Sequence, residues 1–242
     1  MSGQFLMFGL NKRTGLVFIM AWRTEDGIGG IEVLEVFGND LTVVNAARVS
    51  FAKEATEFAE RDAKLVQYLA KHNHISPFFH PQIRLRIKMP IFVAREWFRH
   101  TIGLARNEVS RRYVDTVPQL WWPTADGLRE RDPKLKQGSK SNAVEGAEGI
   151  VTEMRAFGDS TLVLYDSLLA RGVAPEIARA VLPQGMYTEF IETGSLAAYA
   201  RIWALRTDPG AQAEIKAYAI ALETLLLPHF PVSWGALTKK YE

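Results

Sequence analysis

Cysteine is absent from the 242 residues of this chain. The absence excludes disulfides, thiolate metal sites and a cysteine nucleophile. Covalent chemistry on carbon must therefore use another residue or a cofactor. Histidine is scarce as well, with five residues and no HExxH pattern, and His72 and His74 are two positions apart, which on a helix places them on different faces. We therefore expect no catalytic metal.

A large excess of charge and a long hydrophobic run are also lacking. The chain has 29 basic and 27 acidic residues, a net charge of +2, whereas nucleic-acid binders usually carry a basic excess over a whole face. No run approaches the roughly 18 apolar residues of a membrane span. The apolar run at 15–20 is too short and too weakly flanked for a signal peptide. We expect a soluble, cytoplasmic protein that binds neither nucleic acid nor membrane.

The hydrophobic pattern predicts a mixed fold. Strands are expected at 31–37 and 83–88, where Ile83, Leu85 and Ile87 alternate with basic residues. Because the strands come early, with helices between and after them, the fold class is α+β rather than a regular βαβ alternation. Helices are expected at 41–49 (capped by Asp40), 54–72, 91–99, 151–170, 175–181, 195–205 and 211–227.

Domain organisation follows from composition. Residues 1–30 are interpreted as an N-terminal extension and 31–242 as one catalytic domain. Residues 124–145 are rich in Lys, Arg, Gly, Ser and Asp with few apolar anchors, so they form a candidate mobile loop or a solvated surface.

The stretch 99–113 is the most informative part of the chain. It carries four arginines, a histidine, a glutamate, an asparagine and a serine directly after an apolar run, and we expect it to be a turn or loop. The Ser110 hydroxyl, successive backbone N–H groups and an arginine fork suit a phosphate. Glu108 would repel phosphate unless it contacts another part of the ligand or orients an arginine, so its presence favours a nucleotide over a bare polyanion. A surface salt-bridge network is the alternative. Glu96 and Arg99 are three apart on the preceding helix and can pair.

These residues are similar to those of a known protein family. The stretch resembles the signature of the flavin-dependent thymidylate synthases, Arg-His-Arg-x-x-Ser-x-Asn-Glu-x-Ser-x-Arg-Tyr. The resemblance extends in order over roughly 31–226 and includes the segments at 38–51, 72–78, 90–95, 176–183 and 205–206.

The resemblance implies a fold and a reaction. The fold would be a single domain with a central, mostly antiparallel sheet flanked by helices. The enzyme would methylate dUMP to dTMP with methylenetetrahydrofolate as carbon donor and FAD, reduced by NADPH, as hydride carrier. The missing cysteine agrees with this, because classical thymidylate synthases attack uracil with a thiolate. A homotetramer with sites shared between subunits is also implied.

The resemblance assigns two catalytic residues. Arg206 would lie against the uracil edge and favour its N3-ionised form, as an always-charged donor can. His74 would lie near the flavin and folate, although a helix C-cap is its alternative role. The implied substrate-binding residues are Glu96, Arg99, Glu108, Val109, Ser110, Arg111, Arg112, Arg179 and Arg206. The implied FAD-binding residues are Ser50, Ser76, Arg99, His100, Thr101, Asn107, Glu108, Ser195 and Arg201.

The sequence departs from the family mainly at the flavin positions. Thr101 replaces the third residue of the signature, an arginine, and Ala105 replaces its first serine. Six residues instead of five separate His100 from Asn107, so the signature carries one insertion. Arg106 would have to replace the lost arginine. Residues 195–197 read Ser-Leu-Ala where the family commonly has Asn-x-Arg, and Arg201 stands where Asn or His is common.

Two alternatives follow from these observations. The altered flavin positions leave open a flavin- and folate-dependent hydroxymethylation of a deoxypyrimidine nucleotide, in which water rather than hydride completes the reaction. A non-enzymatic nucleic-acid binder that uses Arg84, Arg86, Lys88 and the signature arginines is opposed by the nearly neutral charge.

Overall fold

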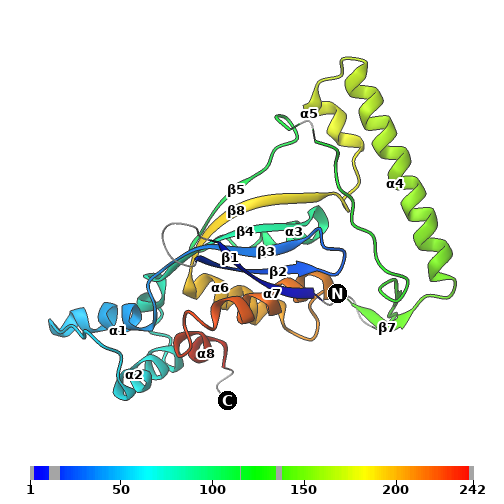
Figure 1. Cartoon of the computed structure of the whole chain (residues 1–242). Coiled ribbons are helices and arrows are strands. Elements are labelled where there is room, and N and C mark those ends of the chain that lie inside the picture. The colour runs from blue at the N-terminus through cyan, green and yellow to red at the C-terminus, as the bar shows by residue number, and fades with distance from the viewer. Residues whose placement is uncertain (1–2, 11–16, 115, 135–137, 240–242) are drawn as a thin grey trace.

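A six-stranded antiparallel sheet forms the centre of the protein. The computed structural model describes residues 3–10, 17–114, 116–134 and 138–239. The strand order is β1-β2-β3-β4-β8-β5, and every neighbouring pair is antiparallel (Figure 1). The predicted α+β class with a mostly antiparallel sheet is confirmed. The strands are β1 (Gly3–Leu10), β2 (Val17–Thr24), β3 (Gly30–Phe37), β4 (Gln82–Pro90), β5 (Leu104–Glu108) and β8 (Tyr187–Ser195).

Alternation along β4 decides which face of the sheet is buried. Ile83, Leu85 and Ile87 are fully buried. Between them, Arg84 and Arg86 point to the other face and form ion pairs with glutamates of β3. A strand with one apolar and one charged face can lie only between a core and solvent.

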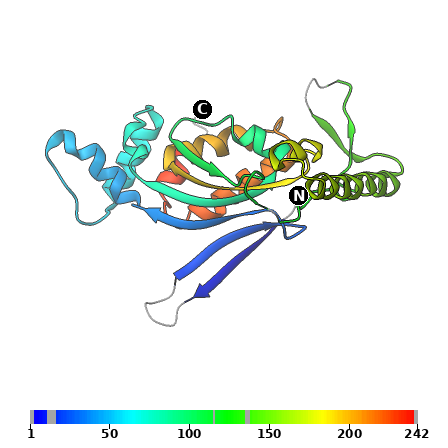
Figure 2. The same cartoon turned by 90° about the horizontal axis from the view of Figure 1, so that it is seen from above.

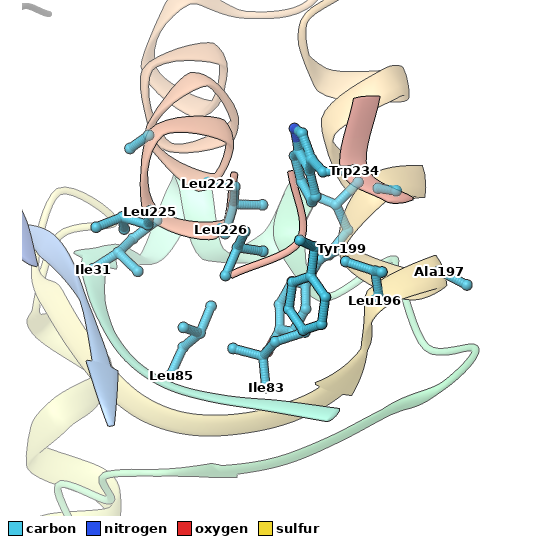
Figure 3. Packing of buried hydrophobic residues seen from close by; sticks show 14 of the residues in the cluster. Ile31, Ile83, Leu85, Leu196, Ala197, Tyr199, Leu222, Leu225, Leu226 and Trp234 are labelled. Carbon is cyan, nitrogen blue, oxygen red and sulfur yellow. The ribbon is translucent and has the colours of Figure 1, made fainter. Parts of the chain in front are cut away.

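Helices cover the apolar face of the sheet. In Figure 1, α6, α7 and α8 lie on the same side of it. Figure 3 shows Leu222, Leu225 and Leu226 of α7 on the side of the core opposite Leu85 of the sheet. The helices are α1 (Asp40–Arg48), α2 (Glu60–Lys71), α3 (Ile91–Trp97), α4 (Ala147–Ala170), α5 (Pro175–Ala178), α6 (Leu196–Arg206), α7 (Ala213–Leu226) and α8 (Ser233–Thr238). None of them, over the described part of the chain, has the length and apolar character needed to cross a membrane.

Two predicted helix starts are corrected. Asn39, not Asp40, caps α1, because the Asn39 side chain accepts hydrogen bonds from the first-turn amides of Leu41 and Thr42. Asp40 instead accepts from the backbone amides of residues 232 and 233, 2.9 Å away. The helix expected from residue 54 begins only at Glu60. Before it, the Asn45 side chain binds the backbone of Ala55 in a non-helical segment.

The charged stretch is also corrected, because part of it is not a loop. Residues 104–108 form the edge strand β5, which pairs with β8. The neighbouring strand β8 and the short helix α8 had no counterpart among the predicted elements. Polar residues suit an edge strand, since one side of it faces solvent.

The two segments expected to be peripheral contain strands. In the N-terminal segment, β2 pairs with β3 and so extends the sheet, and Figure 2 shows β1 and β2 reaching away from the other strands. Within 124–145, β6 (Arg129–Arg131) and β7 (Ser139–Ala143) form a small second sheet. Arg129 binds the Glu214 carboxylate of α7 at 2.8 Å, which fixes this hairpin to the body. Residues 1–2, 11–16 and 135–137 of these two segments lie outside the described residues.

Candidate active site

The edge strand β5 connects two cavities. It runs antiparallel to β8, with Glu108 opposite Phe190 and Leu104 opposite Gly194. The larger cavity lies at the Glu108 end and the smaller at the Leu104 end. Four strand steps, about 14 Å, separate these ends.

The larger cavity has a volume of about 420 Å³, within the range of small-molecule sites. It brings together five residues that the sequence predicted for the substrate. The cavity is lined by Ile91, Glu108, Val109, Ser110, Arg111, Glu176, Arg179, Ala180, Leu182, Met186, Tyr187 and Thr188.

The end of β5 holds the first of these residues in fixed positions. The Thr188 hydroxyl donates to the Glu108 carboxylate at 2.5 Å, so one glutamate oxygen already has a partner. The Val109 amide donates to the Glu189 carbonyl at 2.8 Å. The chain then turns, and the Ser110 hydroxyl oxygen accepts from the Arg112 amide at 3.3 Å. The Ser110 hydroxyl proton remains available to a ligand.

The arginines in and beside this cavity differ in their partners. Arg112, which is not among the lining residues, pairs with the lining residue Glu176 at 3.2 Å, with both side chains about half exposed. Arg111 donates to the Thr116 carbonyl. Among the described residues, no carboxylate lies within 4 Å of the Arg179 guanidinium. Arg179 follows the short helix α5 and presents an uncompensated positive charge, which suits an anionic ligand group.

The smaller cavity, of about 70 Å³, collects four residues that the sequence predicted for the cofactor. These are Arg99, His100, Thr101 and Arg201. Arg99 and His100 follow α3, and Arg201 lies on α6, so the packing of α6 beside the β5 end brings them together. The remaining lining residues are Ile102, Leu104 and Ala198.

Arg206 lies beside this second group and is absent from the lining of the larger cavity. Its Nε donates to His100 Nε2 at 3.0 Å, and its two other nitrogens donate to the carboxylate and the backbone carbonyl of Glu96 at 3.1 and 2.9 Å. The expected Glu96–Arg99 pair is therefore wrong, because Glu96 pairs with Arg206. The side chains of Arg206 and Glu96 are 19% and 28% exposed, so the pair is partly shielded from water.

His100 is held in its neutral form. Burial lowers its pKa, and the nearby charges of Arg206, Arg201 and Arg106 lower it further, to about 4. Because Nε2 accepts from Arg206, the neutral ring carries its proton on Nδ1. The ring thus fixes one side of the Arg206 guanidinium.

Arg106 is held by a buried carboxylate. Its Nε donates to Glu192 Oε2 at 2.6 Å, and Trp97 Nε1 donates to the other Glu192 oxygen at 3.0 Å. The guanidinium lies 4.4 Å from the Phe98 ring centre and donates to the His100 carbonyl at 3.3 Å. Burial raises the pKa of Glu192, and the Arg106 charge opposes that shift. Through these contacts the Arg106 side chain stabilises the protein interior.

A tight turn precedes β5. The pairing of residues 104–108 with β8 has no register shift, and residues 101–103 lie directly before the strand. Gly103 has a φ of +73°, and a Cβ there would lie 2.9 Å from the Ser195 hydroxyl. Only glycine combines that backbone conformation with this close approach.

The other predicted residues lie elsewhere. Ser50 is in a 3₁₀ turn (Val49–Phe51) after α1, and Ser76 begins another (Ser76–Phe79). His74 follows α2, its amide bonds to the Leu69 carbonyl at 2.9 Å, and its exposed ring lies 6.0 Å from that of Tyr68. Ser195 is 1% exposed and caps α6, and Asn107 lies on β5. No single cavity collects all the predicted residues.

Sequence reasoning missed the β8 side of the larger cavity. Met186, Tyr187 and Thr188 line it, and two of them bind carboxylates through their hydroxyls. The run Tyr-Thr-Glu-Phe-Ile-Glu-Thr between Gly185 and Gly194 carries the aromatic and β-branched signal of a strand. Within the described ranges, no group of three or more histidines and carboxylates is arranged to hold a metal ion.

The chain is similar to known proteins over most of its length. The family model of the thymidylate synthase complementing protein matches residues 32–232. The flavin-dependent thymidylate synthase of Kosmotoga olearia is 39% identical over 210 residues, covering 86% of this chain and 89% of the relative. That of Thermus thermophilus is 36% identical over 208 residues, covering 86% and 75%.

A solved structure is similar as well. It is the UMP/dUMP methylase PolB from Streptomyces cacaoi bound with 5-Br dUMP, with a TM-score of 0.78 and 30% identity over 86% of this chain and 94% of that one. The family match spans far more than half of the sequence. The chain is an enzyme that belongs to the thymidylate synthase complementing protein family, the flavin-dependent thymidylate synthases.

Proposed function

We propose that this enzyme methylates dUMP to dTMP in the cytoplasm, with methylenetetrahydrofolate as carbon donor and FAD, reduced by NADPH, as hydride carrier. The observation that carries the proposal is the pair of cavities joined by β5, each lined by a separate group of the residues that the family signature marks. The names of the relatives and of PolB supply the substrate class.

The larger cavity fits the nucleotide. Arg179 carries an uncompensated positive charge for the phosphate, and Ser110 offers a hydroxyl donor beside it. Glu108 is held by Thr188, so it accepts from a sugar hydroxyl with its free lone pairs instead of repelling phosphate. The Arg112–Glu176 pair lies at the surface and can open to add a second positive group.

The smaller cavity fits part of the flavin cofactor. Arg99 and Arg201 are exposed cationic donors that suit a pyrophosphate, with His100 and Thr101 as neutral partners. Bound reduced FAD would supply the hydride. We also assign Ser50, Ser76, Asn107 and Ser195 to the cofactor site. Ser195, as the buried cap of α6, would act through the position of the helix.

Arg206 is proposed to polarise the uracil. Three hydrogen bonds to Glu96 and His100 orient its guanidinium, and a preorganised cation needs little rearrangement when negative charge develops on the base. His74 is proposed to contact the folate and flavin face, consistent with its exposed ring.

A homotetramer with shared sites accounts for two observations. A cavity of about 70 Å³ is far too small for a dinucleotide, since ligand sites typically measure about 300–1,000 Å³. Arg206 also lies outside the cavity that contains Arg179 and Ser110. A neighbouring subunit would complete both sites.

The test is mass spectrometry of the nucleotide formed from dUMP with FAD, NADPH and methylenetetrahydrofolate, run in parallel with UMP. From dUMP we expect a product in which a methyl group replaces one hydrogen, so that its mass is higher by one carbon and two hydrogens. Omission of NADPH should stop turnover after the bound flavin is used. Unchanged dUMP, with a protein that lacks flavin absorbance, would contradict the proposal.

The hydroxymethylation alternative is not favoured. The relatives are named thymidylate synthases, and the similar solved structure is named a methylase. A hydroxymethylated product has a different mass, so the same experiment separates the two reactions.

A further inference from the structure

Part of the segment that precedes the family match contacts a residue that lines the larger cavity. The family model begins at residue 32, whereas the turn between β2 and β3 comprises residues 25–29. From this turn, Asp26 accepts a hydrogen bond of 2.5 Å from the hydroxyl of Tyr187, the first residue of β8. Tyr187 lines the larger cavity. The contact joins residues 161 positions apart in sequence.

The turn fixes the Asp26 carboxylate although this residue lies at the surface. Its Oδ1 accepts from the Thr24 hydroxyl at 2.6 Å and from the Ile28 amide at 3.0 Å. The other carboxylate oxygen of Asp26, Oδ2, accepts the hydrogen bond from the Tyr187 hydroxyl. Partial burial raises the pKa of Asp26, but the hydrogen bonds from Thr24, Tyr187 and Ile28 together lower it below its usual 3.8. The carboxylate is therefore ionised and a strong acceptor at neutral pH.

Tyr187 is held at both of its ends. Its amide donates to the Gln119 carbonyl at 2.8 Å, and its hydroxyl donates to Asp26. The residue is only 4% exposed, and burial together with Asp26 raises the pKa of its hydroxyl, so the group remains a donor. With the hydroxyl bound to Asp26, the ring is the part of Tyr187 that is left to form the cavity wall.

We propose that Asp26 is a positioning residue of the nucleotide site, which acts by holding the Tyr187 ring against the bound uridylate. This inference rests on the proposed function of the larger cavity. It gives the N-terminal segment a role in substrate affinity, because removal of the carboxylate lets the ring leave the cavity wall.

The test measures dUMP affinity by calorimetry in the full-length enzyme, together with KM and kcat. Asp26→Ala and Tyr187→Phe should each weaken dUMP binding about tenfold, the scale of one charge-assisted hydrogen bond. The loss should be in KM, with kcat little changed. Asp26→Asn keeps an acceptor oxygen and should restore most of the affinity. Glu25→Ala, at the neighbouring exposed carboxylate, is the matched control and should bind as the wild type does.

The double variant Asp26→Ala/Tyr187→Phe separates a specific coupling from general damage. If Asp26 acts through the Tyr187 hydroxyl, the double variant loses no more affinity than either single one. Additive losses, or wild-type affinity in Tyr187→Phe, which preserves the ring and its packing, would overturn the inference. A wild-type enzyme that does not bind dUMP would overturn the proposed function, and this inference with it.

Discussion

The two cavities at the ends of β5 differ in how their charged side chains are paired. Around the larger cavity, Arg179 has no carboxylate partner among the described residues, and the Arg112–Glu176 pair is about half exposed. Beside the smaller cavity, Arg206 and Arg106 are fixed by carboxylates and by His100. The first region keeps charge available for a ligand. In the second region, much of the positive charge is used to hold side chains in place. Substitution of an arginine is therefore expected to have different effects in the two regions.

Removal of the buried carboxylate should have the largest effect. Glu192→Ala leaves the Arg106 charge without its partner inside the protein, which costs about 3–5 kcal/mol of folding free energy. Urea unfolding followed by circular dichroism measures this loss. Arg112→Ala, which breaks the half-exposed pair with Glu176, should cost less than about 1 kcal/mol. Equal losses in the two variants would remove the contrast between the regions.

Arg206 should be essential for turnover. We expect Arg206→Ala to lower dTMP formation by about 10²–10³-fold, the scale of losing one preorganised donor, while FAD remains bound. Product mass spectrometry and the flavin absorbance of the purified variant report the two properties. Arg155→Ala, at an exposed position on α4, is the control and should retain full activity. Normal turnover by the Arg206 variant would show that another residue polarises the base.

Arg179 and Arg201 should separate nucleotide from flavin binding. Arg179→Ala should weaken dUMP binding about 10–100-fold, since it removes a charge-assisted hydrogen bond, and should leave FAD affinity unchanged. Arg201→Ala should show the reverse pattern. Calorimetry with each ligand measures both. If each variant weakens both ligands equally, the two cavities do not bind separate molecules.

The smallest effect concerns pH. The pKa of His100 is about 4 in the folded protein and 6.5 in the absence of its folded-state interactions. Between pH 6.5 and 4 the unfolded chain therefore binds more protons at this residue, and stability falls as the pH falls through that window. Above pH 6.5 both states are neutral and the contribution no longer changes with pH. His100→Gln should show a shallower decline in the urea midpoint, and an unchanged slope would contradict the assignment.

Secondary structure was predicted best where the hydrophobic pattern within a single strand or helix is enough to identify it. Alternation of Ile83, Leu85 and Ile87 with arginines predicts β4, because these nine consecutive residues show both the apolar and the charged face of the strand. β8 was missed although its aromatic and β-branched residues carry a strand signal, because Glu192 interrupts the apolar alternation at a fully buried position. The Arg106 that compensates the buried carboxylate is 86 residues away. Such a pairing has no local signal.

The site was predicted in the same uneven way. The family signature led to the residues of β5 and its turn, four of which line the larger cavity together with Arg179. The partners of Arg206 could not be predicted, because they depend on how α3 and α6 pack. Asp26 and Tyr187 carry no signature, and only the strand order β2-β3-β4-β8 within one sheet brings them together.

The turn before β5 bears on where the chain can change length. A residue added at the Gly103 turn would leave β5 in register and would keep the spacing between the two cavities. A residue added three positions later, inside the strand, would move one end by about 3.4 Å and reverse the faces of every following side chain. We therefore expect a change of length to be tolerated in the turn and not in the strand, which sets the distance between the two cavities.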